Sequence, residues 1–203
     1  MALSVGLLAI SVDGAAGQRA DAGADDGTGG AVAAVIAAIA DLAAEQEKLA
    51  WADLVIFQFP LWWFGLPGIL KGWFDRVLAY GWAYGRRERF DSGGLRGRRA
   101  LLAVSVGAPE ARYQEGAIFG SIDRVLYPIQ VGILNYVGLE VLPPFLAFGV
   151  PRVDDATRQA YLTRYAARLL GIERETPLPF HSATLFPDPL GQTSLDPAAL
   201  RRG

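Results

Sequence analysis

The sequence predicts an α/β fold in which helices cover a mostly parallel sheet. The apolar runs Leu54–Phe57 and Leu101–Val106 are typical of strands that are buried on both faces, as strands in parallel sheets are. Stretches with helical spacing of apolar residues lie between these runs, and such alternation indicates parallel strands joined by helical crossovers. With 203 residues, the chain has the length of one domain and can bury a substantial core.

The first 50 residues differ from the rest in charge, because they hold two basic and seven acidic side chains. Leu3–Val12 is an apolar run that can form one strand, and Asp13–Gly30 is rich in Gly, Ala and Asp, which predicts a flexible loop. A helix to about Ala50 is expected from apolar residues at steps of three and four: Val32, Val35, Ile36, Ile39 and Leu42. We therefore expect an atypical N-terminal segment over residues 1–30 and a domain with an irregular C-terminal tail over residues 31–203.

The middle of the chain predicts two further helices. The strand that begins with Leu54 ends at Pro60, and a helix is expected over about Pro67–Ala79. Gly107 ends the second strand. The next helix is expected over about Ser121–Val137, with a kink at Pro128 and an end at the glycine that follows.

The last elements are a strand, a helix and the tail. Val141–Phe148 is apolar but is interrupted by Pro143 and Pro144. A helix begins after its N-cap Asp154 and ends at Leu170, because a glycine follows. From residue 173 on, five prolines predict an irregular tail.

Composition excludes several classes of function. The chain has no cysteine and one histidine, His181, which excludes disulfides, thiolate sites and multi-histidine sites, so no metal is expected. The net charge of −2 indicates neither nucleic acid nor an anionic membrane as a partner. No apolar stretch is long enough to predict a membrane span. A chain without cysteine suits the reducing cytosol, and we expect a cytoplasmic location.

Large aromatic residues follow the first buried strand, in the segment Pro60, Leu61, Trp62, Trp63 and Phe64. Ligands of open parallel sheets bind at the carboxyl ends of the strands, where this segment should lie. The aromatic rings permit two interpretations, which are packing in a core or interface and stacking against a planar ligand.

The second strand ends in a segment of small residues, Ser105, Val106, Gly107 and Ala108, which lets a ligand approach the backbone closely. Tyr113 follows, and its phenol is either structural or a hydrogen-bond donor to a developing oxyanion.

Two other clusters of residues have more than one interpretation. Tyr80–Tyr84 holds two phenols and an indole, which suit a subunit interface, a lid or a site. Six arginines, interleaved with acids, form either a solvated face or a contact for a dinucleotide phosphate: Arg86, Arg87, Arg89, Arg96, Arg98 and Arg99.

Several segments together resemble the flavodoxin-fold NAD(P)H:quinone oxidoreductase family. The similarity runs from about Asp41 to about Leu190, and Ala52–Gly65 is its most specific part. The other matching segments are Leu70–Val77, Tyr127–Gln130, Gly132–Leu134 and Glu175–Leu178. The resemblance implies a flavodoxin-like three-layer sandwich and a homodimer in which bound FAD, rather than FMN, alternately meets NAD(P)H and a quinone. The implied reaction is a two-electron hydride transfer with a ping-pong pattern.

The resemblance also implies roles for individual residues. It assigns Pro60, Leu61, Trp62, Trp63 and Phe64 to one flavin-binding loop, and Ser105, Val106, Gly107 and Ala108 to another. Arg158 stands where a flavin-contacting arginine is expected, and Tyr113 matches the catalytic tyrosine. Tyr84 matches a tyrosine that is presented to the other subunit's flavin. The expected substrate pocket consists of Trp63, Phe64, Tyr84, Tyr113 and Phe119.

The chain departs from the family in two places. Phe119 stands where mammalian members have a histidine that relays protons, which a phenyl ring cannot do, so Tyr113 or water has to supply the proton. Before Asp41 the chain is shorter than the family, and nothing there resembles the loop that holds the pyrophosphate of FAD at a helix start. The N-terminal edge of the sheet is therefore expected to be short or replaced, through a different start or frame, loss of function or a changed role.

Three functions are compatible with these residues. The leading hypothesis is an NAD(P)H:quinone oxidoreductase with FAD. The alternative is a flavin-poor, non-catalytic dimeric protein of the same fold that binds a small ligand or a partner. A third hypothesis is a flavin reductase that acts on acceptors other than quinones.

Overall fold

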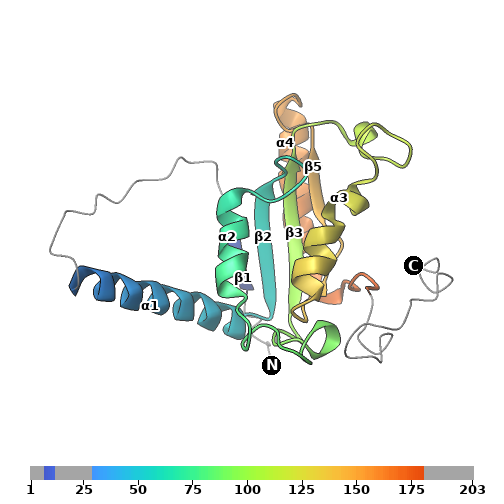
Figure 1. Ribbon diagram of the computed structural model, residues 1–203. Coiled ribbons are helices and arrows are strands. Elements are labelled where there is room, and N and C mark those ends of the chain that lie inside the picture. The colour runs from blue at the N-terminus through green and yellow to red at the C-terminus, as the bar shows by residue number, and fades with distance from the viewer. Residues whose placement is uncertain (1–6, 12–28, 181–203) are drawn as a thin grey trace.

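A parallel sheet forms the middle layer of the computed structural model, which describes residues 7–11 and 29–180 (Figure 1). Its strands are β1 (Leu7–Ser11), β2 (Leu54–Pro60), β3 (Arg99–Val106), β4 (Glu140–Val141) and β5 (Phe145–Phe148). β1, β2 and β3 follow one another across the sheet, and β4 and β5 both pair with β3, every pairing being parallel. The predicted α/β fold with a parallel sheet is therefore confirmed.

β4 and β5 share one position in the sheet. β4 pairs with the start of β3 at Arg99 and Ala100, and β5 pairs with its end at Ala103–Val106. Pro143 and Pro144 lie between the two short strands, and proline has no N–H group to donate to a strand ladder. The interruption expected in this strand is confirmed.

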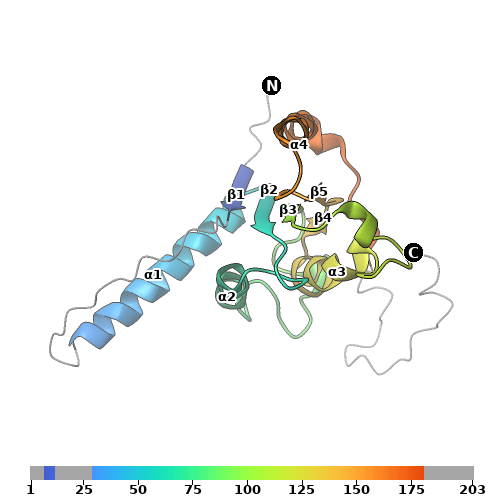
Figure 2. The ribbon, with the colours of Figure 1, turned by 90° about the horizontal axis from the view of Figure 1, so that it is seen from above.

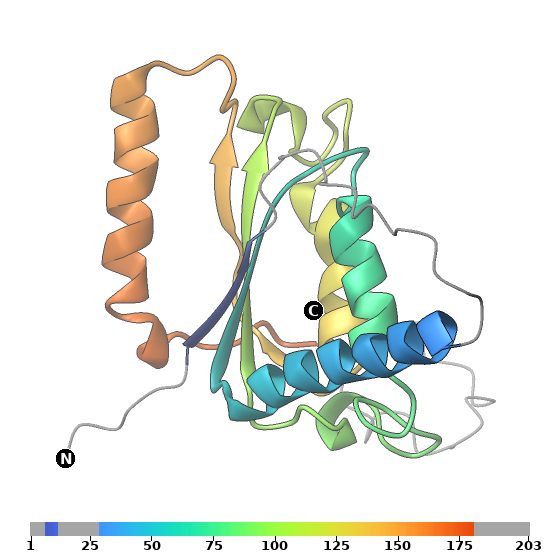
Figure 3. The ribbon, with the colours of Figure 1, turned by 90° about the vertical axis from the view of Figure 1, so that its left-hand side faces the viewer.

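Helices flank the sheet on both faces, as the edge-on view shows (Figure 3). The helices are α1 (Gly29–Trp51), α2 (Gly68–Val77), α3 (Ile122–Ile129), which continues as a π-helix over Gln130–Asn135, and α4 (Asp155–Leu169). α1, α2 and α3 lie on one face, and α4 lies on the other (Figure 2). These helices confirm the predicted ones within a few residues.

Local chemistry explains where these helices change or end. The Asp154 carboxylate accepts a hydrogen bond from the Thr157 N–H at 2.8 Å, so the predicted N-cap of α4 is confirmed. Pro128 lies inside α3, and the helix becomes a π-helix two residues later, where a kink was expected. Gly138 follows with a φ of 99°, which favours glycine and ends the helical segment as predicted.

The side chains of β2 and β3 divide between two cores. Val55, Phe57 and Phe59 are buried toward α2 and α3, where they belong to the larger cluster. Leu54 and Ile56 are buried in a smaller cluster on the α4 face, with partly buried side chains of α4 packed against it. Over the apolar runs Leu54–Phe57 and Leu101–Val104, both faces of the two strands therefore exclude water, as these runs predict.

Side chains of α4 also cover the edge strand β5. The Tyr161 hydroxyl donates a hydrogen bond to the Phe148 carbonyl at 2.9 Å, and Arg164 Nη2 donates one to the Leu146 carbonyl at 3.1 Å. Since these carbonyls belong to β5, α4 holds the edge of the sheet by polar contacts as well as by apolar packing.

Arginine and glutamate side chains fix the segment after α4. Arg99 donates hydrogen bonds to the carbonyls of Ile172, Glu173 and Glu175. Arg168 binds both carboxylate oxygens of Glu175 at 2.7 Å, and both side chains are mostly shielded from solvent. The basic cluster of the sequence is thus not only a solvated face, because Arg99 ties two distant segments together.

We expect Glu175→Gln to lower the free energy of unfolding by about 2 kcal/mol at pH 7, the order of a charge-assisted hydrogen-bond pair. The bond to Arg168 lowers the pKa of Glu175 below its ordinary value of 4.5. A carboxyl with a lowered pKa stabilises the fold fully above 4.5 and loses this effect as the pH falls through its folded-state pKa. Urea unfolding of both proteins at pH 7 and pH 3 should show the difference shrinking at pH 3. An equal difference at both values would contradict the assignment.

Some expectations concern residues that the structure does not describe. β1 lies within the predicted run Leu3–Val12, but most of the predicted loop Asp13–Gly30 and the part of the predicted tail from His181 on lie outside the described residues. The division at residue 30 stays a prediction. In the part that is described, no helix is both long and apolar enough to cross a membrane.

Candidate functional site

The loop after β2 is a tight turn that presents aromatic side chains to solvent. Trp62 and Gly65 exchange two backbone hydrogen bonds, with N···O distances of 3.2 Å and 2.8 Å. Trp63 and Phe64, between them, have φ angles of 51° and 58°. Bulky residues rarely adopt this left-handed region, at a cost of about 1–3 kcal/mol each, and such strain clusters at ligand sites. Trp63 is 99 % exposed, so packing in this chain's own core does not explain the turn.

Three loops meet at the carboxyl ends of the strands. The Leu61 N–H donates a hydrogen bond to the Ser105 carbonyl at 2.8 Å, which joins the start of the loop after β2 to the end of β3. The Gly149 N–H donates one to the Ala108 carbonyl at 3.0 Å, which joins the loop after β5 to the same place. The first two segments singled out in the sequence are therefore adjacent in space, at the edge where open parallel sheets bind ligands.

Gly107 leaves open space in this loop. A Cβ atom built on Gly107 would meet no other atom within 4 Å, although its neighbours are held by backbone hydrogen bonds. Arg152 Nη1 donates a hydrogen bond to the Gly107 carbonyl at 3.0 Å, so the conformation of the loop is fixed from the outside. The gap is consistent with a ligand that lies directly against the backbone.

Four aromatic rings form a continuous cluster beside the turn. The ring centroid of Phe119 lies 5.3 Å from that of Phe64 and 5.2 Å from that of Tyr113. Tyr113 also lies 6.2 Å from Phe64 and 5.8 Å from Phe148. The structure thus brings together three residues of the expected substrate pocket and adds Phe148, from the end of β5.

Tyr113 is nearly buried in this cluster, and burial raises the pKa of its phenol above the ordinary value of 10.0. Below that value the phenol therefore keeps its proton and can donate a hydrogen bond.

In a pH titration of the tyrosines, the phenol of Tyr113 should ionise among the last, because burial raises its pKa. We therefore expect Tyr113→Phe to reduce the amplitude of the phase at the highest pH. Absorbance at 295 nm, followed against pH for both proteins, measures this phase. Burial also raises the pKa of Tyr165, so Tyr165→Phe is the matched control and should remove a separate part. Loss of an ordinary, early-titrating tyrosine in Tyr113→Phe would contradict the placement.

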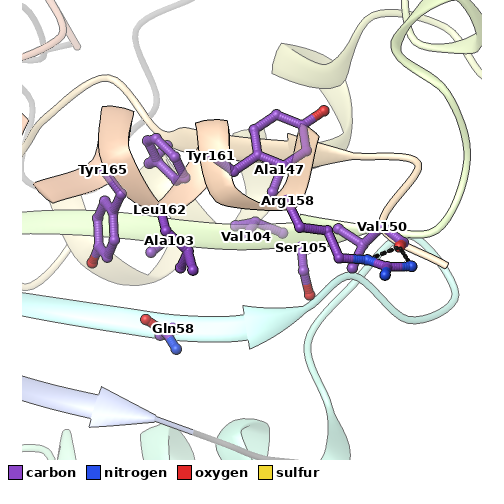
Figure 4. A pocket seen from close by; sticks show the side chains of 11 residues that line it. Gln58, Ala103, Val104, Ser105, Ala147, Val150, Arg158, Tyr161, Leu162 and Tyr165 are labelled. Carbon is purple, nitrogen blue, oxygen red and sulfur yellow. Dashed lines mark hydrogen bonds between the residues drawn. The ribbon is translucent and has the colours of Figure 1, made fainter. Parts of the chain in front are cut away.

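A pocket of about 360 Å³ lies between α4 and the sheet (Figure 4). Ser105 lines it from β3, and Gln58 lines it from β2 with its side chain exposed. Tyr161 and Tyr165 of α4 form part of its wall. Arg158 reaches the mouth, where its guanidinium is 3.4 Å from the Val150 carbonyl and 2.6 Å from the Asp155 carboxylate. In the described part of the chain, α4 is the helix that packs on this face, and the pocket lies beside it.

Tyr84 lies apart from the aromatic cluster. Its ring packs against Tyr80 at 5.7 Å and Tyr136 at 5.5 Å between centroids. With Lys71 and Ile133, among others, Tyr84 and Tyr136 line a separate pocket of about 420 Å³ between α2 and the π-helix. The single chain does not bring Tyr84 to Tyr113, and its expected role across a subunit boundary stays a prediction.

Comparison with known proteins places this geometry in a family. A family model described as a flavodoxin-like fold matches residues 19–169, which is most of the chain. The chain belongs to the flavodoxin-like fold family. The predicted three-layer sandwich is thereby confirmed for this flavodoxin-like chain.

Individual relatives match the same part. NAD(P)H dehydrogenase (quinone) 1 of Rattus norvegicus is 42 % identical over 146 residues, which cover 72 % of this chain and 53 % of the rat protein. A putative quinone reductase of Klebsiella pneumoniae is 44 % identical with a TM-score of 0.67, covering 70 % of this chain and 58 % of that one. General stress protein 14 of Treponema denticola, solved with FMN, is 36 % identical with a TM-score of 0.54, covering 65 % and 71 %. The chain spans little more than half the length of the first two.

Sequence reasoning missed several residues of this flavodoxin-like site. Phe148 ends a strand, and its position could have been inferred from the rule that ligands bind at strand ends. Tyr161 and Tyr165 lie at helical spacing from Arg158, which places all three on one side of α4. Within residues 37–180, whose side chains are described, no group of three or more His, Asp or Glu residues could hold a metal ion.

Proposed function

We propose that the chain is an NAD(P)H:quinone oxidoreductase that works with a bound flavin. The observation that carries the proposal is the exposed, strained turn at Trp63 and Phe64, which lies beside the protonated phenol of Tyr113 at the carboxyl edge of the sheet. The identities to a rat quinone dehydrogenase and a Klebsiella pneumoniae quinone reductase support it.

The described residues fit a flavin. The gap above Gly107 suits close contact of a flat ring with backbone, and the rings of Trp63 and Phe64 suit stacking. Ser105 and the guanidinium of Arg158 suit polar and anionic groups at the mouth of the α4 pocket. FAD has a second aromatic group, its adenine, and Tyr161 and Tyr165 would form a wall for it. FMN lacks an adenine, so this pocket favours FAD over FMN. When bound, the flavin supplies the two-electron chemistry that carries a hydride from NAD(P)H to a quinone.

The chain's own residues would bind and orient the substrates. Trp63 and Phe64 would hold a planar nicotinamide or quinone by stacking, and the rings of Phe119 and Phe148 would keep water out. Tyr113 Oη would donate a hydrogen bond to the substrate oxygen that gains negative charge. Phe119 has no proton to give, so water would have to replace whatever proton Tyr113 passes on.

A homodimer is part of this proposal. The pocket with Tyr84 and Tyr136 is open to solvent and apart from Trp63, so in a pair of chains it could complete the partner's site. We also propose a cytoplasmic location, as the cysteine-free composition suggests.

The test uses the full chain, purified and incubated with FAD or with FMN. After removal of free flavin, retained oxidised flavin should absorb near ~450 nm, with more FAD than FMN retained. NADH or NADPH with menadione should then give the parallel double-reciprocal lines of ping-pong kinetics. A colourless protein that is inactive after incubation would overturn the proposal in favour of a non-catalytic binding protein. Activity with other acceptors but not with quinones would indicate a flavin reductase of another kind.

A further inference from the structure

We propose that Arg112 makes the site selective for electron acceptors that carry an anionic substituent on a planar ring. This selectivity deepens the proposed quinone reductase function and rests on it. Arg112 would be a specificity-determining residue, because its charge would meet the substituent and not the reacting atoms.

The position of Arg112 is fixed by the loop that holds the aromatic cluster. It ends a short 3₁₀-helix, Glu110–Arg112, and directly precedes Tyr113. The Phe119 N–H donates a hydrogen bond to the Arg112 carbonyl at 3.1 Å, which closes the loop between them. The backbone therefore ties Arg112 to two members of the cluster.

The side chain of Arg112 lies over the ring of Phe119. The distance from Arg112 Cζ to the ring centroid is 5.7 Å, within the range of a cation–π contact. Phe119 in turn packs against Phe64 and Tyr113. The guanidinium is thus held at the rim of the same cluster that would receive a planar substrate.

The charge of this guanidinium is uncompensated among the described residues. A guanidinium group carries a positive charge and has no acceptor of its own. No described carboxylate forms an ion pair with Arg112, and the nearby Glu115 pairs with Arg124 at 3.1 Å. Glu110 lines a different pocket, together with Arg164 and Arg168. A cation that is positioned by an aromatic ring and exposed to solvent is available to an anionic ligand.

The chemistry of this rim favours one class of acceptor. A flat ring that stacks in the cluster would bring its substituents to the rim, where a sulfonate or carboxylate meets the guanidinium. The phosphate of the nicotinamide donor is a second source of negative charge, and the experiment separates the two.

The activity test compares 1,4-naphthoquinone-2-sulfonate with menadione for the flavin-loaded protein. Arg112→Gln should lower kcat/KM about five-fold for the sulfonate and less than two-fold for menadione, the size expected for one exposed charge pair. Arg174→Gln is the matched control, because it removes an exposed arginine from the 3₁₀-helix Ile172–Arg174, which lies beside the first residue of β3, and should leave both values unchanged. Arg112→Lys keeps the charge and should retain most of the preference. A rise from 50 to 300 mM NaCl should weaken the preference only where the charge is present.

A binding test does not depend on turnover. Calorimetric titration of the same proteins with naphthalene-2-sulfonate and with its neutral analogue naphthalene-2-sulfonamide should show an Arg112-dependent difference in Kd for the sulfonate alone. If neither quinone is reduced but this difference is found, the proposed function fails and the anion site stands. If menadione is reduced and Arg112→Gln affects both acceptors equally, or changes only the KM for NADPH relative to NADH, the selectivity proposal is overturned.

Discussion

Replacing Gly107 by leucine should weaken flavin binding at least about 30-fold and change the melting temperature by no more than a few degrees. A Cβ at Gly107 meets no atom of the chain within 4 Å, and the φ of this residue lies outside the left-handed region, so the fold can accept a side chain there. The space that the side chain would fill is the gap in which we place the ligand. Overpacking a fixed contact costs about 2 kcal/mol, which corresponds to this factor in Kd.

Flavin titration, followed by fluorescence quenching or by absorbance, measures the change at Gly107. Gly72→Leu is the matched control, because Gly72 also faces open space but lies in α2, away from the loops at the carboxyl edge. Its Kd for flavin should equal that of the unmodified chain. If Gly107→Leu retains flavin with unchanged affinity, the ligand does not lie against this loop and the proposed site is misplaced.

Gly94→Ala should lower the free energy of unfolding by about 3 kcal/mol, at the upper end of the cost of overpacking. A Cβ at Gly94 would lie 2.2 Å from the Trp82 carbonyl oxygen and 3.1 Å from the Ala83 Cα. These are backbone atoms, and the Gly94 N–H is bonded to the Ala83 carbonyl at 2.9 Å, so the two segments cannot separate without losing that bond.

Urea unfolding of Gly94→Ala, with the midpoint and slope both recorded, tests this close approach. Gly72→Ala serves as the control with the opposite sign, because alanine in an open helical position is favoured over glycine by about 0.5–1 kcal/mol. An unchanged midpoint for Gly94→Ala would mean that the two segments are not in contact as described.

Sequence patterns predicted the fold well, because a strand that is buried on both faces has a continuous run of apolar residues. The run at Leu54–Phe57 is apolar since each of its side chains is buried by one core or the other. The proline pair at 143 and 144 likewise forecasts the split between β4 and β5, because its cause is local and covalent.

The site was predicted only in part, because its key properties depend on conformation and on distant contacts. The sequence places Trp63 and Phe64 at a strand end, but nothing in it encodes their positive φ angles or the full exposure of Trp63. The cation–π contact of Arg112 with Phe119 depends on how the loop between them closes. The α4 pocket depends on which helices cover a sheet face, which single elements do not reveal.

The covered edge of the sheet has a consequence for how this chain can associate. An exposed edge strand invites another chain to add a strand, which leads to fibres or aggregates. Here β5 is short, two prolines interrupt the edge, and Tyr161 and Arg164 already bond to the Leu146 and Phe148 carbonyls. A strand added at this edge would meet two carbonyls that are already bonded and two positions without an N–H donor, so strand addition at this edge is blocked.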